Sequence, residues 1–189
     1  DKRIGIINVG LGGNSISRWT KFDDNHPHYK NSQILANESW NGTPGDLYDI
    51  HTSDINMALS LTTKKYLDVL LWHQGENDGW SRNDMDLQDF YRHALIQVIK
   101  QYRSESFGNI QMPFIVGDRS GGYAGYNLGW EARNSELNDL NIDADPYTKC
   151  VYLSDLECNT DNVHFTSESQ RIMGVRYFQK FRSMYSKSY

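Results

Sequence analysis

Short strand-like runs alternate along the chain with longer stretches in which apolar residues recur every three or four positions. This alternation predicts β-strands separated by α-helices, and such chains build a parallel sheet with helices on both of its faces. The 189 residues contain no repeat, low-complexity tract or linker, so we predict one domain over residues 1–189. The strand-like runs span residues 4–9, 67–72, 113–117 and 149–153, and the helical patterns span residues 46–63, 86–103, 127–141 and the stretch that begins near Thr166, a suitable N-cap.

Three of the expected helices carry apolar residues at helical spacing. One face of residues 86–103 holds Leu87, Phe90, Tyr91, Ala94, Leu95, Val98, Ile99 and Tyr102. In residues 46–63 the apolar positions are Leu47, Ile50, Met57, Ala58 and Leu61. We expect the last helix to turn four side chains inward, namely Ile172, Val175, Phe178 and Phe181.

The composition excludes several classes of protein. A net charge of −5 without any Lys/Arg cluster argues against nucleic acid as the main partner. No apolar run approaches the roughly 20 residues that span a bilayer, so we expect no membrane segment. The aromatic fraction of 13% suits a carbohydrate binder, because aromatic faces stack on sugar rings, although most of the rings are expected in the core. The two cysteines, Cys150 and Cys158, fit no zinc motif and form either one disulfide or two free thiols.

Polar loops follow three of the four predicted strands, and open α/β sheets bind ligands at the carboxyl ends of their strands. The first loop, from Gly10 to Trp19, is rich in glycine, so it either presents backbone N–H groups to a ligand or forms a tight turn. The second runs from Trp72 to Trp80. Its amides, Gln74 or Asn77, can donate to a developing oxyanion; the alternative is a hydrogen-bonded Asx turn.

The third loop brings a carboxylate and an imidazole close together just before the last helix. Asp161 and His164 are three residues apart, so a turn can join them. A carboxylate that holds one ring nitrogen leaves the other free as a general base. A lone histidine at a helix start is more often a structural or capping residue, but this pairing at the ligand-binding edge of the sheet predicts a catalytic pair.

The other histidines lack such a setting in the sequence. No His-x-x-x-His pair and no carboxylate cluster supports a metal site, so we expect neither a metal nor an organic cofactor. The histidines concerned are His26, His28, His51, His73 and His93.

Taken together, the loops resemble three sequence blocks of the SGNH/GDSL hydrolase superfamily, and most closely those of the sialate O-acetylesterase and acetylxylan-esterase-like carbohydrate esterases. Gly12-Gly13 resembles the second block, which gives a backbone N–H to the oxyanion hole, and Asp161-x-x-His164 resembles the fifth block, the Asp and His of a Ser-His-Asp triad. The likeness covers essentially all 189 residues in order and spacing.

The third block, Gly-x-Asn-Asp, resembles Gly75-Glu76-Asn77-Asp78, and its Asn serves the oxyanion hole as well. The related carbohydrate esterases usually have Ser where this chain has Asn77. The resemblance therefore leaves two candidates for the side-chain donor, Asn77 and Gln74.

The resemblance implies a three-layer α/β/α sandwich with a parallel, flavodoxin-like sheet of strand order 2-1-3-4-5. In this family the nucleophilic serine follows a first strand upstream of the second block, and that block has no place in this chain. We therefore expect the chain to be the C-terminal part of a longer precursor whose preceding segment supplies the first strand and the serine. Without that strand, a gap between residues 4–9 and 67–72 would leave strand edges unpaired and apolar surface exposed.

Two serines inside the chain are alternative nucleophiles. Ser15 lies in the glycine-rich loop, where the family has a structural Ser or Thr. Ser120 lies in Gly117-Asp118-Arg119-Ser120, which is a Gly-Asp-Ser motif interrupted by an arginine. Both matches rest on short motifs, and for Ser120 the block order is wrong as well.

The implied activity is hydrolysis of acetyl esters on sugars through an acyl-enzyme. The alternatives are an inactive carbohydrate-binding module with the same fold, and an acetyl transferase. The expected partner is an acetylated carbohydrate, with no nucleic acid and no membrane, and a secreted or extracellular location, including a phage tail, is favoured over the cytoplasm. Four aromatic residues in the site-edge loops are expected to line the sugar subsite, namely Trp19, Trp80, Tyr123 and Trp130.

Overall fold

The computed structural model describes residues 4–79, 87–118 and 145–185. Its sheet has three parallel strands in the order β1 (Leu70–Trp72), β2 (Phe114–Gly117) and β3 (Thr148–Val151). In the register of the sheet, Phe114 lies opposite both Leu70 and Thr148. The prediction of an α/β fold with a parallel sheet is confirmed. The predicted helix at residues 127–141 lies outside the described residues.

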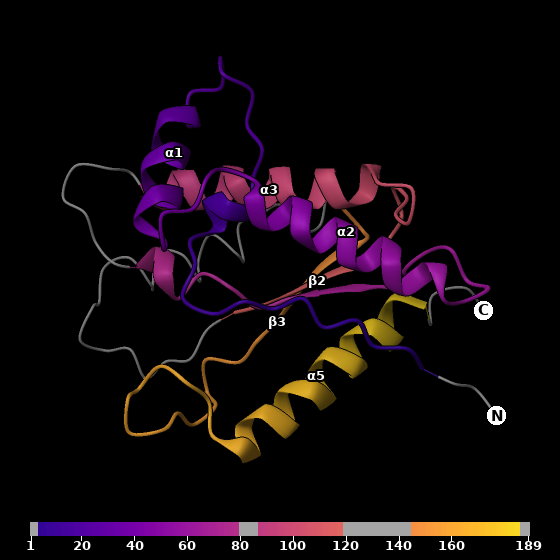
Figure 1. Ribbon diagram of the computed structural model, residues 1–189. Helices are drawn as coiled ribbons and strands as arrows, with labels where there is room; N and C mark the ends of the chain where they lie inside the picture. Colours follow the sequence, from indigo (N-terminus) through magenta and orange to yellow (C-terminus); the bar gives the residue numbers. More distant parts are fainter. Residues whose placement is uncertain (1–3, 80–86, 119–144, 186–189) are drawn as a thin grey trace.

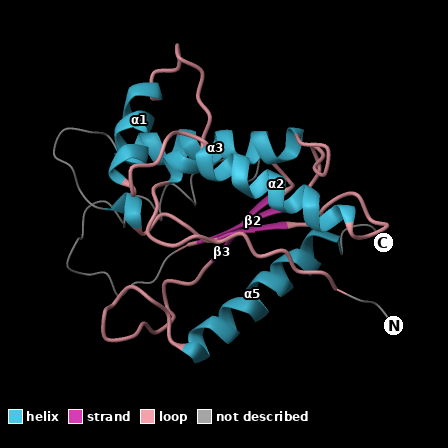
Figure 2. Cartoon of the chain, in the orientation of Figure 1, coloured by secondary structure: helices cyan, strands magenta, loops and turns pink. Residues whose placement is uncertain are grey.

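Helices cover both faces of the sheet (Figures 1 and 2). On one face lie α1 (Tyr29–Glu38), α2 (Asp46–Ser60) and α3 (Leu87–Ser104), and the 3₁₀ helix η1 (Ile16–Trp19) packs among these three. On the other face α5 (Ser167–Tyr185) packs on β2 and β3. This arrangement is the expected α/β/α sandwich.

The buried face of α3 agrees with the sequence pattern, since Phe90, Tyr91, Ala94, Leu95, Val98, Ile99 and Tyr102 are all buried. The apolar pattern predicted for α2 agrees less well with the structure, because three of its residues are exposed, namely Ile50, Met57 and Leu61. The residues that α2 buries follow a strict four-residue spacing, which keeps them on one side of the helix, and they are Leu47, His51, Ile55 and Leu59, together with Tyr48.

The last helix begins where predicted but faces the sheet differently. The Oγ1 of Thr166 accepts the N–H of Ser169 at 3.2 Å, which confirms Thr166 as the N-cap. The helix is anchored by Tyr177, which is 5% exposed and donates from its hydroxyl to the Trp72 carbonyl at 2.8 Å. Because successive residues are about 100° apart around a helix, Val175 and Phe178 lie on other sides and are exposed, contrary to the prediction.

Gly117, the last residue of β2, allows this close approach of α5 to the sheet. A Cβ at this position would lie 2.3 Å from the Tyr177 hydroxyl and 2.7 Å from His73 Nδ1. Any larger residue at position 117 would therefore push α5 away from the carboxyl end of β2.

Residues 4–9 do not form a strand, although the sequence predicts one there. A strand needs a hydrogen-bonded neighbour, and within the described residues the outer edge of β1 has none. Ile4 and Ile6 are 85% and 87% exposed, and Leu71 of β1 is 54% exposed. The described part of the sheet thus ends in an open, apolar edge at β1, where the resemblance places the first strand.

Both cysteines carry free thiols, and burial raises the pKa of Cys150 to about 11. In the described part of the chain we find no helix of the length and apolar character that a membrane span requires.

Candidate active site

Asp161 and His164 meet in a compact loop between β3 and α5. The Asp161 Oδ2 lies 2.8 Å from His164 Nδ1, and its Oδ1 accepts the backbone N–H groups of Val163 and His164 at 2.8 and 2.9 Å. Asn162 adopts the left-handed conformation, with φ of 57°, and this residue type tolerates that conformation well. Both carboxylate oxygens of Asp161 therefore face groups of the same turn, Oδ1 two backbone N–H groups and Oδ2 the His164 ring.

The electrostatics of the pair favour an ionised Asp161. The N–H groups of Val163 and His164, together with the His164 ring, lower the pKa of this carboxyl to about 2. The His164 side chain is 77% exposed. Its Nδ1 faces Asp161, so Nε2 is the nitrogen left to exchange a proton with another group.

The base of this loop is fixed to its neighbours by backbone contacts. Cys158 and Phe165 form an antiparallel bridge, and the N–H of Thr166 donates to the Glu157 carbonyl at 3.1 Å. The Phe165 ring in turn lies 5.7 Å from the His73 ring, measured between ring centroids. The Asp161–His164 loop therefore packs against the loop that follows β1.

The glycine-rich loop and the loop after β1 are joined through one buried carboxylate, that of Asp78, which is 4% exposed. It accepts the Ser15 hydroxyl at 2.5 Å, the Ile16 N–H at 2.9 Å and the Gln74 amide at 2.6 Å. The two predicted halves of the oxyanion hole thus lie next to each other. Asp78 positions them, a role that was not assigned from the sequence.

The two candidate amide donors, Gln74 and Asn77, differ in how many amide hydrogens remain available for a ligand. Gln74 donates both of its amide hydrogens, one to Asp78 and one to the Asn14 carbonyl at 2.9 Å. Asn77, in the 3₁₀ helix η2 (Asn77–Gly79), donates one to the Ser39 hydroxyl at 3.2 Å. An amide carries two donor hydrogens, so Asn77 keeps one for a ligand.

The glycine-rich loop keeps backbone donors as well. The N–H groups of Gly12 and Gly13 have no acceptor within the described ranges, and both residues are exposed. Gly13 has a φ of 74°, which favours glycine, and its carbonyl accepts the Trp40 indole N–H at 3.0 Å. Gly12, Gly13 and Asn77 therefore keep N–H groups that can donate to a ligand, whereas Gln74 has none left.

Another carboxyl group lies at this end of the sheet, directly after β2. Asp118 is 5% exposed and accepts the N–H of Leu153. Burial raises its pKa to about 6, against the opposing effects of the Leu153 N–H and of charge on His73.

The remaining predicted residues lie elsewhere. Trp19 is 3% exposed, packs edge-on against Trp72 and donates to His51 Nδ1 at 2.9 Å, so it offers no free face to a sugar. Ser15 is buried, and its hydroxyl is committed to Asp78. The other predicted aromatic residues and the second alternative nucleophile lie outside the described residues, namely Trp80, Tyr123, Trp130 and Ser120.

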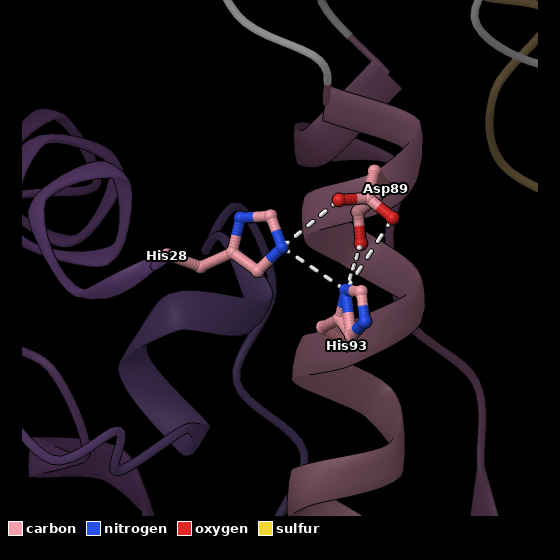
Figure 3. Close-up of side chains that lie close together, drawn as sticks. All are labelled: His28, Asp89 and His93. Carbon is pink, nitrogen blue, oxygen red and sulfur yellow. Dashed lines mark hydrogen bonds and ion pairs between the residues drawn. The ribbon is translucent and has the colours of Figure 1, made fainter. Parts of the chain in front are cut away.

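The structure also brings together a group that the sequence interpretation missed. His28, Asp89 and His93 place ligand atoms within 4.8 Å of one another (Figure 3). Two of these residues, Asp89 and His93, are four apart on a helix that was predicted correctly, so their shared face was readable from the sequence. The third comes from a distant loop, and no local spacing could have revealed it.

Comparisons with known proteins show the family of nearly all of this chain and a solved structure with a similar fold. Residues 1–183 match the family described as carbohydrate esterase, sialic acid-specific acetylesterase. Among solved structures, that of an Arabidopsis thaliana protein determined at 1.6 Å resolution superimposes with a TM-score of 0.65 at 19% sequence identity. The alignment covers 91% of this chain and 58% of the plant protein, so this chain spans little more than half of that structure. No curated protein matches the sequence.

Proposed function

Because the chain belongs to the sialic acid-specific acetylesterase family of carbohydrate esterases, we propose that it hydrolyses acetyl esters on sugars with Asp161 and His164 as two members of a catalytic triad. The observation that carries this proposal is the 2.8 Å contact between Asp161 Oδ2 and His164 Nδ1, made in a loop that leaves the imidazole open to solvent. No metal or organic cofactor has a part in this reaction.

The reaction begins when a serine hydroxyl attacks the carbonyl carbon of the acetyl group and His164 Nε2 takes its proton. The tetrahedral intermediate collapses, the bond from carbon to the sugar oxygen breaks, and His164 returns the proton to that oxygen. Water then attacks the acyl-enzyme by the same route and releases acetate. Throughout, Asp161 holds the tautomer of the ring and stabilises the imidazolium.

The negative oxygen of the intermediate would be stabilised by the N–H groups of the glycine-rich loop and by the amide of Asn77. Support comes from the unoccupied donors at Gly12 and Asn77, and from Asp78, which joins their two loops. Preorganised donors of this kind stabilise the transition state without any rearrangement during the reaction.

We propose that the serine arrives on a strand that pairs with the open edge of β1. An unpaired edge offers a row of N–H and C=O groups to an added strand. Leu71 on β1 is exposed, and so are Ile4 and Ile6 in residues 4–9, where the sequence predicts a strand. This exposed apolar surface supports an added apolar strand at this place. The segment that carries this strand would belong to the same precursor.

The test is labelling with a fluorophosphonate probe and mapping of the labelled peptide, on protein expressed from its complete reading frame. We expect one labelled serine outside these 189 residues, and strongly reduced labelling in His164→Ala but not in the control His26→Ala. Acetate release from O-acetylated sialic acid and from acetylated xylose would then define the sugar. A label on Ser15 or Ser120 would contradict the assignment, and sugar binding without any label would favour a binding module.

A second assay separates hydrolysis from transfer. The unlabelled enzyme is incubated with an acetylated sugar and a large excess of a free sugar as acceptor. Hydrolysis releases acetate in equal amount to the deacetylated sugar, whereas transfer yields the acetylated acceptor in place of acetate.

A further inference from the structure

Three metal-ligating side chains converge where α1 begins beside α3 (Figure 3). His28 is the residue before α1, while Asp89 and His93 lie one turn apart on α3. The Nε2 of His28 lies 3.0 Å from Asp89 Oδ2 and 3.0 Å from His93 Nδ1. The Nδ1 of His93 lies 3.4 Å from Asp89 Oδ1.

The two ring nitrogens that face each other limit where their protons can lie. Only one proton fits between the ring nitrogens of His28 and His93. If His28 carries it, the lone pair of His93 Nδ1 faces the Asp89 backbone carbonyl, whose oxygen is 3.2 Å away. If His93 carries it, the lone pair of His28 Nε2 faces the Asp89 carboxylate at 3.0 Å. If both nitrogens carry a proton, each donates to an oxygen of Asp89, and the two N–H groups then lie side by side with their nitrogens 3.0 Å apart.

A cation offers a further arrangement, because it accepts electron pairs from both rings and the carboxylate at once. Ligands at about 2.0–2.1 Å from a tetrahedral Zn²⁺ are about 3.3 Å from one another. The two ring nitrogens lie 3.0 Å apart, and each is close to a different oxygen of Asp89, His28 Nε2 to Oδ2 at 3.0 Å and His93 Nδ1 to Oδ1 at 3.4 Å, so the contacts are near that spacing. With one ligand atom from each residue within 4.8 Å of the others, the three side chains lie close enough together to share one ion.

We propose that His28, Asp89 and His93 bind a divalent transition-metal cation of the Zn²⁺ class and that the ion ties the start of α1 to α3. Two imidazoles and one carboxylate suit such a cation, whereas Mg²⁺ and Ca²⁺ take oxygen ligands. The Asp89 and His93 side chains are 46% and 45% exposed, so the remaining coordination position opens to solvent.

This site is separate from the Asp161–His164 pair. It lies in the layer of α1, α2 and α3, whereas the Asp161–His164 loop leads into α5 on the opposite face of the sheet (Figure 1). A ligand that binds the folded state but not the unfolded state stabilises a protein. The ion should therefore raise the melting temperature without taking part in ester hydrolysis.

Calorimetric titration of the metal-free protein with Zn²⁺, and with Mg²⁺ for comparison, tests the proposal. We expect one Zn²⁺ per chain, no saturable Mg²⁺ binding, and an affinity at least about tenfold weaker in His28→Gln and in His93→Gln. His26→Gln is the matched control: its ring lies 5.5 Å from that of His28, between centroids, outside the three ligands, and the glutamine oxygen can replace its Nδ1 as acceptor of the His28 N–H. It should bind Zn²⁺ as the unaltered protein does.

Nitrogen-15 spectra of the histidine rings in the unaltered protein give a second measurement that does not depend on how the variants fold. Zn²⁺ should shift Nε2 of His28 and Nδ1 of His93, and leave the signals of His164 in place. Three results would each overturn the proposal. They are the absence of saturable Zn²⁺ binding, an equal affinity for Zn²⁺ in both glutamine variants and the unaltered protein, and shifts confined to other histidines.

Discussion

Asp161 uses both carboxylate oxygens on its own turn: Oδ2 faces His164 Nδ1 at 2.8 Å, while Oδ1 accepts the N–H groups of Val163 and His164. The backbone of the turn thus fixes the carboxylate, and the carboxylate fixes the ring. No residue of another element is needed for this orientation, although the ring is largely exposed. The proposed catalytic pair is therefore a local unit whose imidazole stays open to solvent.

The first prediction concerns this local unit. Asp161→Asn should lower kcat by on the order of 10⁴-fold, because an amide N–H facing Nδ1 favours the wrong tautomer of His164. Steady-state hydrolysis of an acetylated sugar checks this. Asp155→Asn is the control, since Asp155 pairs with Arg176 at the surface and not with a histidine. Equal rates for the two variants would exclude Asp161 from the triad.

The second prediction separates the two candidate oxyanion donors. Asn77→Ala should lower kcat by roughly 10²–10³-fold with little change in KM, as expected for a donor that acts in the transition state. The surface variant Asn109→Ala should leave both constants unchanged. Gln74→Ala should act mainly on stability, because its amide serves Asn14 and Asp78. A loss of kcat in Gln74→Ala alone, with normal stability, would reverse the assignment.

The third prediction concerns the buried carboxylate between the loops. Asp78→Ala removes the acceptor of Ser15, Ile16 and Gln74, and each buried donor left without a partner costs about 1–3 kcal/mol. The free energy of unfolding in urea should fall by at least about 3 kcal/mol. Asp49→Ala, which removes only a surface pair with Lys21, should change it by less than about 1 kcal/mol. A similar loss in both variants would mean that Asp78 does not join the loops.

The sequence predicted those elements whose pattern is strong along the chain itself. In α3, apolar residues repeat through five turns, so its buried face was predicted correctly. The Asp161–His164 pair was predictable for the same reason, since the two residues are three apart and one turn brings their side chains together. The strand at residues 4–9 was not confirmed, because pairing depends on a neighbour that no local pattern describes.

What the sequence could not predict depends on contacts between distant segments. The placement of Val175 and Phe178 follows from how Tyr177 docks against Gly117, which is a matter of tertiary packing. Trp19 was expected near the sugar because it follows the glycine-rich loop, but η1 turns it into the core against Trp72. His28 likewise meets Asp89 only once the helices are in place.

The last prediction uses the buried carboxyl at the end of β2. The pKa of Asp118 is raised to about 6 by burial, so the folded protein holds a proton there that the unfolded chain, with an ordinary Asp pKa near 3.9, has released. Between about pH 4 and pH 6 the folded state therefore binds more protons than the unfolded state. The free energy of unfolding contributed by this group falls as pH rises through that window.

Asp118→Asn should remove this dependence, because the amide can still accept the N–H of Leu153 but does not titrate. Relative to the unaltered protein, its free energy of unfolding should rise by up to about 3 kcal/mol between pH 4 and pH 7, since one pKa unit corresponds to about 1.4 kcal/mol. Urea unfolding at several pH values measures the difference, and repeating it in His73→Gln separates the charge of the nearby imidazole from the effect of burial. Parallel pH curves for the two proteins in both backgrounds would mean that Asp118 is ionised throughout the window, and that the carboxyl end of β2 is more accessible to water than its burial implies.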